Sequence, residues 1–366
     1  MVRVNSARDL GPQLVRNPHR MVGQDGAFSI QLGPKHRDET LWFFGDTLVG
    51  TRPHNHSIWL IDNQLVGPRD MTGRGTFEQM INNTGLLLPK QTGANGLRDF
   101  RYLLDPRGRL KNLLPLEAAH SEHPDRDRIW CQHGIAIGDD IFLSFIQVRM
   151  LDEPMPPLPL AFEIVGSGLA RGRIGEWNFI RITRDRDHLL WKADQPHFAT
   201  AFLNDERRGI VYCYGTVSRG GTQRCYLARV APEHFAEPAR WEYFSSDAPT
   251  WHGDVARAIP IFDRMPSECS VSFNEHLGCY LAVHSLLLTG DIVARTAPEP
   301  WGPWSGPTTL WHAKPTPMKY PRPYELPLIY AGKEHPQLAR DGGRTIYLTY
   351  IEFEEYFPHL VEVTLG

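Results

Sequence analysis

The sequence predicts an all-β protein, namely a five-bladed β-propeller that forms one domain over residues 1–366. Two observations support this prediction. Helical periodicity is scarce along the chain, which 30 prolines and 32 glycines interrupt. One pattern also recurs five times: an apolar strand, a polar turn, and a second strand rich in aromatic and β-branched residues. A β-sandwich would explain such strands but not their regular spacing.

The five hairpins supply the first two strands of each blade. Their turns centre near Gly33, Gly138, Asn204, Glu275 and Asp341. The last three intervals between turns are 66, 71 and 66 residues, whereas the first is 105 residues. The longer interval indicates an insertion at residues 63–126, within or after the first blade.

Each hairpin should be followed by the outer strands of its blade. Third strands are expected at residues 57–63, 177–185, 224–232, 291–297 and 359–365. Outer fourth strands are expected at residues 241–246 and 308–313. The fifth hairpin, "HPQLARDGGRTIYLTYIE", is expected to begin at His335.

The composition excludes several classes of protein. The net charge is −3 with scattered lysines and arginines, which argues against a nucleic-acid or anionic-membrane partner. No apolar run approaches the ~18 residues of a membrane span. The five cysteines contain no Cys-x-x-Cys pair, so we expect reduced, buried thiols. The first 20 residues lack the apolar region of a secretory signal, so we expect a cytosolic protein or one whose signal has been removed.

Polar residues recur where the first strands begin. In a propeller these strands line the central channel, and the second strands return to the same mouth, so these residues should cluster in space. They are Asp25, Gln132 with His133, His197, Glu268, and Glu334 with His335, and Asp46 ends the second strand of the first blade. One such residue would be an ordinary turn cap. We interpret five convergent copies as a functional site.

Four segments resemble a known family: "GQDGAFS…LWFFGDT", "SECSVSFNEHLGCYLAV", "IVARTAPEPWGPWS" and "HPQLARDGGRTIYLTY". They are similar to the five-bladed propeller glycosidases, formerly a domain of unknown function, that are associated with endo-D-arabinanases. The resemblance extends from about Val22 to Gly366. It implies an endo-acting glycoside hydrolase on D-arabinofuranosyl polysaccharide. It also implies that Asp25 and Asp46, in the Asp-Gly-Ala-x-Ser and Gly-Asp-Thr motifs, are the catalytic carboxylates.

Glycoside hydrolysis needs two carboxyl groups, one as proton donor and the other as nucleophile or base. Two acids held close together cannot both ionise easily, so one of them keeps its proton near neutral pH. Asp25 and Asp46 on adjacent strands would favour retention of configuration. Asp25 paired with Glu268 across the channel would favour inversion, with Asp46 orienting its neighbour. We favour the first arrangement.

The other polar residues at the mouth are candidates for substrate binding, because amide, imidazole and indole groups can contact sugars. These candidates are Gln132, His133, His197, Glu334, His335 and Trp130. Two further pairs are expected to have structural roles, a polar loop and packing between blades respectively: Asn82 with Asn83, and Trp301 with Trp304.

No cofactor is expected, although a structural calcium or sodium ion could sit in the channel. Two other functions stay open at this point. A glycoside phosphorylase would need cations beside the acids, for which Arg128, Lys319 and Arg322 are candidates. A non-catalytic sugar-binding propeller would keep both aspartates ionised and bonded to backbone, with no open pocket above them. Carbohydrate is the predicted partner in every case.

Overall fold

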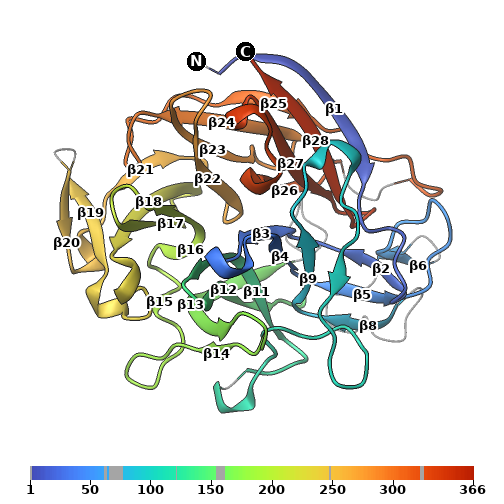
Figure 1. The fold of residues 1–366 in the computed structure, drawn as a ribbon. Helices are drawn as coiled ribbons and strands as arrows, with labels where there is room; N and C mark the ends of the chain where they lie inside the picture. The colour runs from blue at the N-terminus through green and yellow to red at the C-terminus, as the bar shows by residue number, and fades with distance from the viewer. Residues whose placement is uncertain are drawn as a thin grey trace.

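The computed structural model shows a propeller built from β-strands (Figure 1). It describes residues 2–61, 64–65, 77–120, 122–153, 161–246, 249–321 and 325–366. Within these ranges, five antiparallel sheets of four or more strands stand around a central axis. The predicted all-β propeller is confirmed, and the five larger sheets correspond to its blades.

The blades follow one another in chain order. The strands of each blade are given below from the innermost strand outwards. The first contains β3 (Phe28–Gln31), β4 (Glu39–Phe44), β9 (Thr84–Pro89) and β10 (Arg101–Tyr102). The second contains β11 (Asp127–Ile137), β12 (Asp140–Met150) and β13 (Phe162–Arg173), with β14 (Ile180–Arg181) and β15 (Trp191–Lys192) on β13. The third contains β16 (His197–Asp205), β17 (Ile210–Arg219), β18 (Thr222–Val230), β19 (Glu242–Ser246) and β20 (Thr250–His252), with β21 (Pro260–Asp263) on β18.

The fourth blade contains β22 (Cys269–Asn274), β23 (Cys279–Ser285), β24 (Asp291–Ala297) and β25 (Thr308–His312). The fifth contains β26 (Ile329–Glu334), β27 (Thr345–Glu352), β28 (Pro358–Leu365) and β1 (Val4–Pro12). The N-terminal strand is therefore the outermost strand of the C-terminal blade, so the two ends of the chain close the ring (Figure 1).

Two smaller sheets accompany the blades. One contains β2 (Met21–Gln24), β5 (Thr47–Gly50) and β8 (Phe77–Ile81), and the other contains β6 (Leu60–Ile61) and β7 (Gln64–Leu65). The helical segments of the described residues are 3₁₀ turns: Pro34–His36, Gly93–Asn95, Ala118–His120, Pro232–His234, Pro238–Arg240, Val255–Arg257, Pro336–Leu338 and Asp341–Gly343. None of them is long and apolar enough to cross a membrane.

Apolar side chains from neighbouring blades form the core, because each sheet is covered on both faces. The β4 strand, for example, is buried from Thr40 to Phe44. Between the first two blades, Phe28 and Phe43 pack in one cluster with Ile129 and Phe145. All five cysteines are unpaired, four of them buried, as the sequence predicts.

Third strands are predicted correctly in the last three blades, as β18, β24 and β28, and both outer strands are confirmed as β19 and β25. The predictions at residues 57–63 and 177–185 are wrong, because β9 and β13 occupy these places. The first-blade strands β9 and β10 lie inside the segment 63–126 that we expected to be an insertion. In β13, the glycines of "GSGLARGRIG" hide the strand pattern.

Those glycines are required by close packing. A Cβ atom at Gly168 would lie 2.3 Å from the carbonyl oxygen of His188, and one at Gly166 would lie 2.7 Å from that of Trp191. The strand therefore passes where a side chain would collide with backbone, and glycine is the residue that fits.

The start of the fifth blade is also corrected. Its innermost strand is β26, Ile329–Glu334, and the segment that begins at His335 forms a 3₁₀ turn rather than a strand. Glu334 therefore ends the inner strand instead of preceding it. The residue of this strand that reaches Asp25 is Tyr330, near the start of β26.

Candidate active site

The two aspartates of the first blade lie on neighbouring connections between two sheets. Asp25 joins β2 to β3, and Asp46 joins β4 to β5. The Asp25 amide donates to the Asp46 carbonyl at 3.3 Å, and the Gly45 amide donates to the Asp25 carbonyl at 3.0 Å. The connection that enters the first blade therefore lies beside the connection that leaves it. This arrangement brings the carboxyl groups of Asp25 and Asp46 close together.

The connection from β2 to β3 requires an unusual backbone conformation. Gly26 and Ala27 both have positive φ angles, of 81° and 58°, and glycine adopts this region at little cost. A Cβ atom at Gly45 would lie 2.4 Å from Oδ1 of Asp25. Glycine at position 45 therefore leaves the space that the carboxyl group of Asp25 occupies.

A cavity of about 410 Å³, which we call the acid cavity, opens above these connections. Three half-buried carboxyl groups line it: Asp25, Asp46 and Glu268. They come from two positions in the first blade and from the residue that precedes β22 of the fourth blade. Other polar residues lining it are Arg128, Trp130, Gln132, Gln223, Ser267, Tyr330 and Tyr356.

Asp25 is held by tyrosines. The Tyr330 hydroxyl donates to Oδ2 of Asp25 at 2.9 Å, and Tyr356 also contributes a side-chain hydrogen bond. Burial raises the pKa of Asp25, while these hydrogen bonds and the charge of Lys333 oppose the rise.

Asp46 is held by two N–H donors. Nδ2 of Asn82 donates to its Oδ1 at 3.2 Å, and Nε1 of Trp130 donates to its Oδ2 at 3.3 Å. Burial, and next the charge of Asp25, raise the pKa of Asp46 to about 7, while Arg128 opposes the rise. The two aspartates therefore share the property expected of an acid and base pair, since they resist being ionised together.

Glu268 has a different environment. Nζ of Lys333 lies 3.7 Å from its Oε1, and 18% of its side chain is exposed. Burial raises the pKa of Glu268 to about 7; Lys333 lowers it and the charge of Asp25 raises it. Asp25 thus interacts electrostatically with both other acids and links them.

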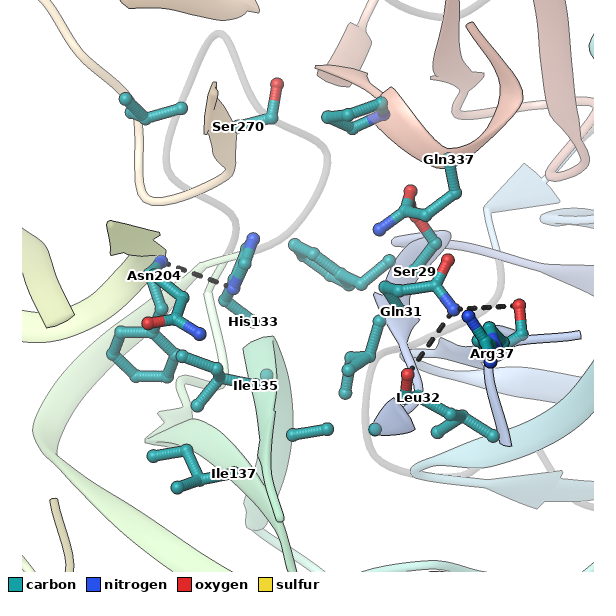
Figure 2. Close-up of a pocket in the computed structure, with 18 of the residues that line it drawn as sticks. Ser29, Gln31, Leu32, Arg37, His133, Ile135, Ile137, Asn204, Ser270 and Gln337 are labelled. Atoms are coloured by element: carbon teal, nitrogen blue, oxygen red, sulfur yellow. Dashed lines mark hydrogen bonds between the residues drawn. The ribbon is translucent and has the colours of Figure 1, made fainter. Parts of the chain in front are cut away.

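A second cavity, which we call the channel cavity, has a volume of about 640 Å³ and lies between the inner strands of the blades. His133, Glu334 and Lys333 line it, as do the polar groups of Gln31, Ser270 and Gln337. Figure 2 shows His133, Ser270 and Gln337 around this space, with His133 accepting a hydrogen bond from the amide of Phe202 at 3.3 Å. Burial raises the pKa of Glu334 to about 7, and Oγ of Ser272 donates to it.

The predicted site residues therefore separate into three groups. Asp25, Asp46, Glu268, Gln132 and Trp130 line the acid cavity. His133 and Glu334 line the channel cavity. His197 and His335 line neither cavity.

His335 is buried between the fifth blade and the first blade. Its ring stacks on Trp42 at 4.2 Å, and its two nitrogens contact Oγ of Ser29 at 2.8 Å and Oγ1 of Thr349 at 2.7 Å. His197 is buried within β16, at the first residue of the strand. Neither imidazole is open to a substrate in this arrangement, so we no longer expect sugar contacts from them.

Gln132 has one feature that points to a ligand. The residue is 4% exposed, and its side-chain Oε1 is buried without a hydrogen-bond partner. A buried amide oxygen without a donor is costly. A hydroxyl group bound in the acid cavity could supply that donor.

Sequence reasoning missed Tyr330, Tyr356, Lys333 and the role of Asn82. The first and third were hidden by the shifted start of β26. Asn82 lies in the segment that we expected to be an ordinary polar loop, yet it donates to Asp46, whereas Asn83 is structural and accepts from the amide of Cys131 at 3.0 Å. Trp301 and Trp304 pack between blades, as expected.

The described part of the chain contains no group of three His, Cys, Asp or Glu residues arranged to hold a metal ion. Of the cations proposed for phosphate, Arg128 lines the acid cavity and Lys319 lines neither cavity. Arg322 lies outside the described residues.

A family model described as "Domain of unknown function (DUF4185)" matches residues 17–362. No protein with a curated description matches the chain significantly. The match to the family model supports the predicted relation to a family of unknown function, while the arabinanase activity stays a prediction.

Several solved structures are similar. A protein from Bacteroides ovatus ATCC 8483, provisionally assigned as a hydrolase, has a TM-score of 0.62 and 17% identity, over 97% of this chain and 87% of that one. An endo-arabinase from Bacteroides thetaiotaomicron has a TM-score of 0.49 and 10% identity, over 95% and 96%. An α-L-arabinofuranosidase from Podospora anserina has a TM-score of 0.47 and 9% identity, over 97% and 94%. The first shows a shared fold, and the other two are too distant to carry an argument about this chain.

Proposed function

We propose that this chain, which belongs to the DUF4185 family, is a glycoside hydrolase that cleaves D-arabinofuranosyl polysaccharide internally. The observation that carries the proposal is the acid cavity itself. Three carboxyl groups from distant parts of the chain line it, and the pKa values of Asp46 and Glu268 are each raised to about 7. One ionised and one protonated carboxyl group at neutral pH is what glycoside hydrolysis requires.

We assign Asp25 and Asp46 as the catalytic pair. Burial raises the pKa of Asp25, but the two tyrosines donate hydrogen bonds that favour its carboxylate form, which suits a nucleophile or base. Asp46 keeps its proton up to a pH of about 7 and can give it to the departing sugar oxygen. Glu268 would then bind the substrate or tune Asp25.

The competing assignment makes Glu268 the acid and leaves Asp46 to orient Asp25. It is favoured by the exposure of Glu268 to the cavity and by its similar pKa of about 7. The two assignments differ in their response to the leaving group, because a lost general acid matters least when the leaving group needs no proton.

The test uses purified protein, a D-arabinan, other furanosyl polymers, and aryl arabinofuranosides. Asp25→Asn should lower turnover on the best substrate by at least about 10³-fold. Asp46→Asn should lower it strongly on the polymer and much less on an aryl glycoside with an acidic phenol. Asp38→Asn, an exposed position at the far end of the same hairpin, is the matched control and should act like the wild type.

Full turnover in both Asp25→Asn and Asp46→Asn would refute the assignment. If Glu268→Gln rather than Asp46→Asn shows the leaving-group effect, the acid is Glu268. Product size decides between internal and terminal cleavage, and the anomer first released decides between retention and inversion.

A non-catalytic propeller requires two ionised aspartates without a pocket above them. We favour hydrolysis because a cavity opens above both aspartates and the pKa of Asp46 is raised to about 7. The phosphorylase alternative is favoured by Arg128, which lines the acid cavity beside Asp46. Adding inorganic phosphate and looking for a sugar 1-phosphate tests it directly.

A further inference from the structure

Lys333 is a buried lysine at the boundary between the two cavities. Its side chain is 2% exposed. It lines the channel cavity, while its ammonium group reaches Glu268 of the acid cavity at 3.7 Å. Burying an ammonium group is costly unless acceptors surround it. The groups that surround the ammonium group therefore indicate the role of its charge.

Four acceptors surround Nζ of Lys333. It donates to the carbonyl oxygen of Gly26 and, at 2.7 Å, to that of Ala331. It lies 4.2 Å from the centre of the Phe28 ring, whose face attracts a cation. The fourth is the carboxyl group of Glu268. Gly26 follows Asp25 directly, so the side chain of Lys333 connects the backbone next to Asp25 with the carboxyl group of Glu268.

A β-bulge in β26 places the side chains of Tyr330 and Lys333 on the same side of the strand. Tyr330 pairs with Ile351 and Lys333 pairs with Thr349, so two residues on β26 face one on β27 between these pairs. In a regular strand, residues three apart point to opposite faces. The extra residue shifts that alternation, and Tyr330 and Lys333 both reach the acids.

We propose that Lys333 is a positioning residue of the active site, which fixes Asp25 through the Gly26 carbonyl and supplies the positive charge opposite Glu268. This inference rests on the proposed function. The charged and titratable groups that face Lys333 are Asp25, Glu268, Cys269, His133 and His335.

The charges around the site are divided between two cations. Lys333 lowers the pKa values of Asp25 and Glu268, whereas Arg128 lowers that of Asp46. Burial and the charge of Lys333 lower the pKa of His133 to about 4 and that of His335 well below its usual value, so both imidazoles are neutral. Lys333 therefore acts on the acids without competition from a charged histidine.

The test compares Lys333→Met with the wild type by carbon-13 NMR titration of the Glu268 carboxyl group, assigned by its absence in Glu268→Gln. The apparent pKa of Glu268 should rise by about one unit or more in Lys333→Met, because an adjacent opposite charge is removed. On the best substrate, kcat should fall about 10²-fold with little change in KM, since Asp25 is no longer held in place. Arg128→Met should leave the Glu268 titration unchanged.

An unchanged Glu268 titration in a folded Lys333→Met protein would overturn the proposal, because a lysine that supplies the positive charge opposite Glu268 must shift this titration when it is removed. The NMR readout needs no substrate, so an inactive wild type would count against the proposed function alone. If Lys333→Met does not fold, the reciprocal variant Glu268→Gln decides: the nitrogen-15 titration of Lys333 Nζ should move to lower pH, and an unmoved titration would refute the coupling.

Discussion

The acid cavity and the channel cavity lie in the same propeller, and each is lined by a carboxyl group whose pKa is raised to about 7. In the channel cavity, that group is Glu334, whose shift comes from burial with a hydroxyl group of Ser272 opposing it. In the acid cavity, Asp46 and Glu268 are shifted by burial and also by the charge of Asp25. A raised pKa alone therefore does not mark a catalytic acid. The convergence of several carboxyl groups distinguishes the acid cavity.

Among the predictions that compare the two cavities, the largest expected effect concerns the space around Asp25. In Gly45→Ala, the new Cβ atom would lie 2.4 Å from Oδ1 of Asp25, so the carboxyl group must move. We expect kcat to fall about 10²-fold, because small displacements of catalytic groups have effects of this size. Steady-state kinetics on the best substrate measures it.

Gly253→Ala is the matched control, because a Cβ atom there meets nothing within 4 Å. Equal activity of the Gly45→Ala and Gly253→Ala proteins would show that the position of Asp25 is not critical. The distinction between the two cavities would then lose its main support.

A smaller effect separates the two candidate acids through the pH profile. Activity should fall above a pH of about 7, because the acid must be protonated to donate and the pKa values of Asp46 and Glu268 are about 7. Arg128 lowers the pKa of Asp46, so Arg128→Gln should move this alkaline limb to higher pH if Asp46 is the acid. The measurement is kcat/KM between pH 4 and 9. A limb that stays in place in Arg128→Gln but moves in Lys333→Met would assign the acid to Glu268.

The smallest effect tests the channel cavity. The pKa of Glu334 is about 7 in the folded protein, and 4.5 is the ordinary value expected in the unfolded chain. The folded protein therefore binds this proton more tightly than the unfolded chain does. The free energy of unfolding should therefore decrease as pH rises from about 4.5 to 7, and stay lower above that range.

Glu334→Gln removes this loss, which is on the order of 3 kcal/mol at pH 7. Chemical denaturation at pH 4.5 and 7.5 should show the variant gaining stability over the wild type only at the higher pH. Its turnover should stay within about threefold of the wild type. A large loss of turnover would place Glu334 in the catalytic site and abolish the contrast between the cavities.

The propeller and all three acids of the acid cavity were accessible from the residues alone. Alternating strands, turn residues and a spacing of 66 to 71 residues indicated the blades. Asp25 and Asp46 flank a hairpin, so their proximity followed from antiparallel pairing. Glu268 was found because it precedes the fourth inner strand, although only the closed ring brings it to the first blade.

The errors arose where local pattern and tertiary packing disagree. The β13 strand was missed because its glycines, which make room for neighbouring backbone, remove the alternation that reveals a strand. The start of β26 was misplaced, so Glu334 and His335 were expected at the mouth in place of Tyr330. No sequence pattern marks the bulge between Tyr330 and Lys333.

The sequence by itself determined the number and order of the blades and the chemical types of residue at their ends, because these follow from hydrophobic periodicity and turn chemistry. Only the tertiary structure decided which of those residues share a cavity and how they are charged. Both depend on strand register, on bulges and on burial next to residues from other blades, and a pKa is shifted by neighbours in space rather than by neighbours in the chain.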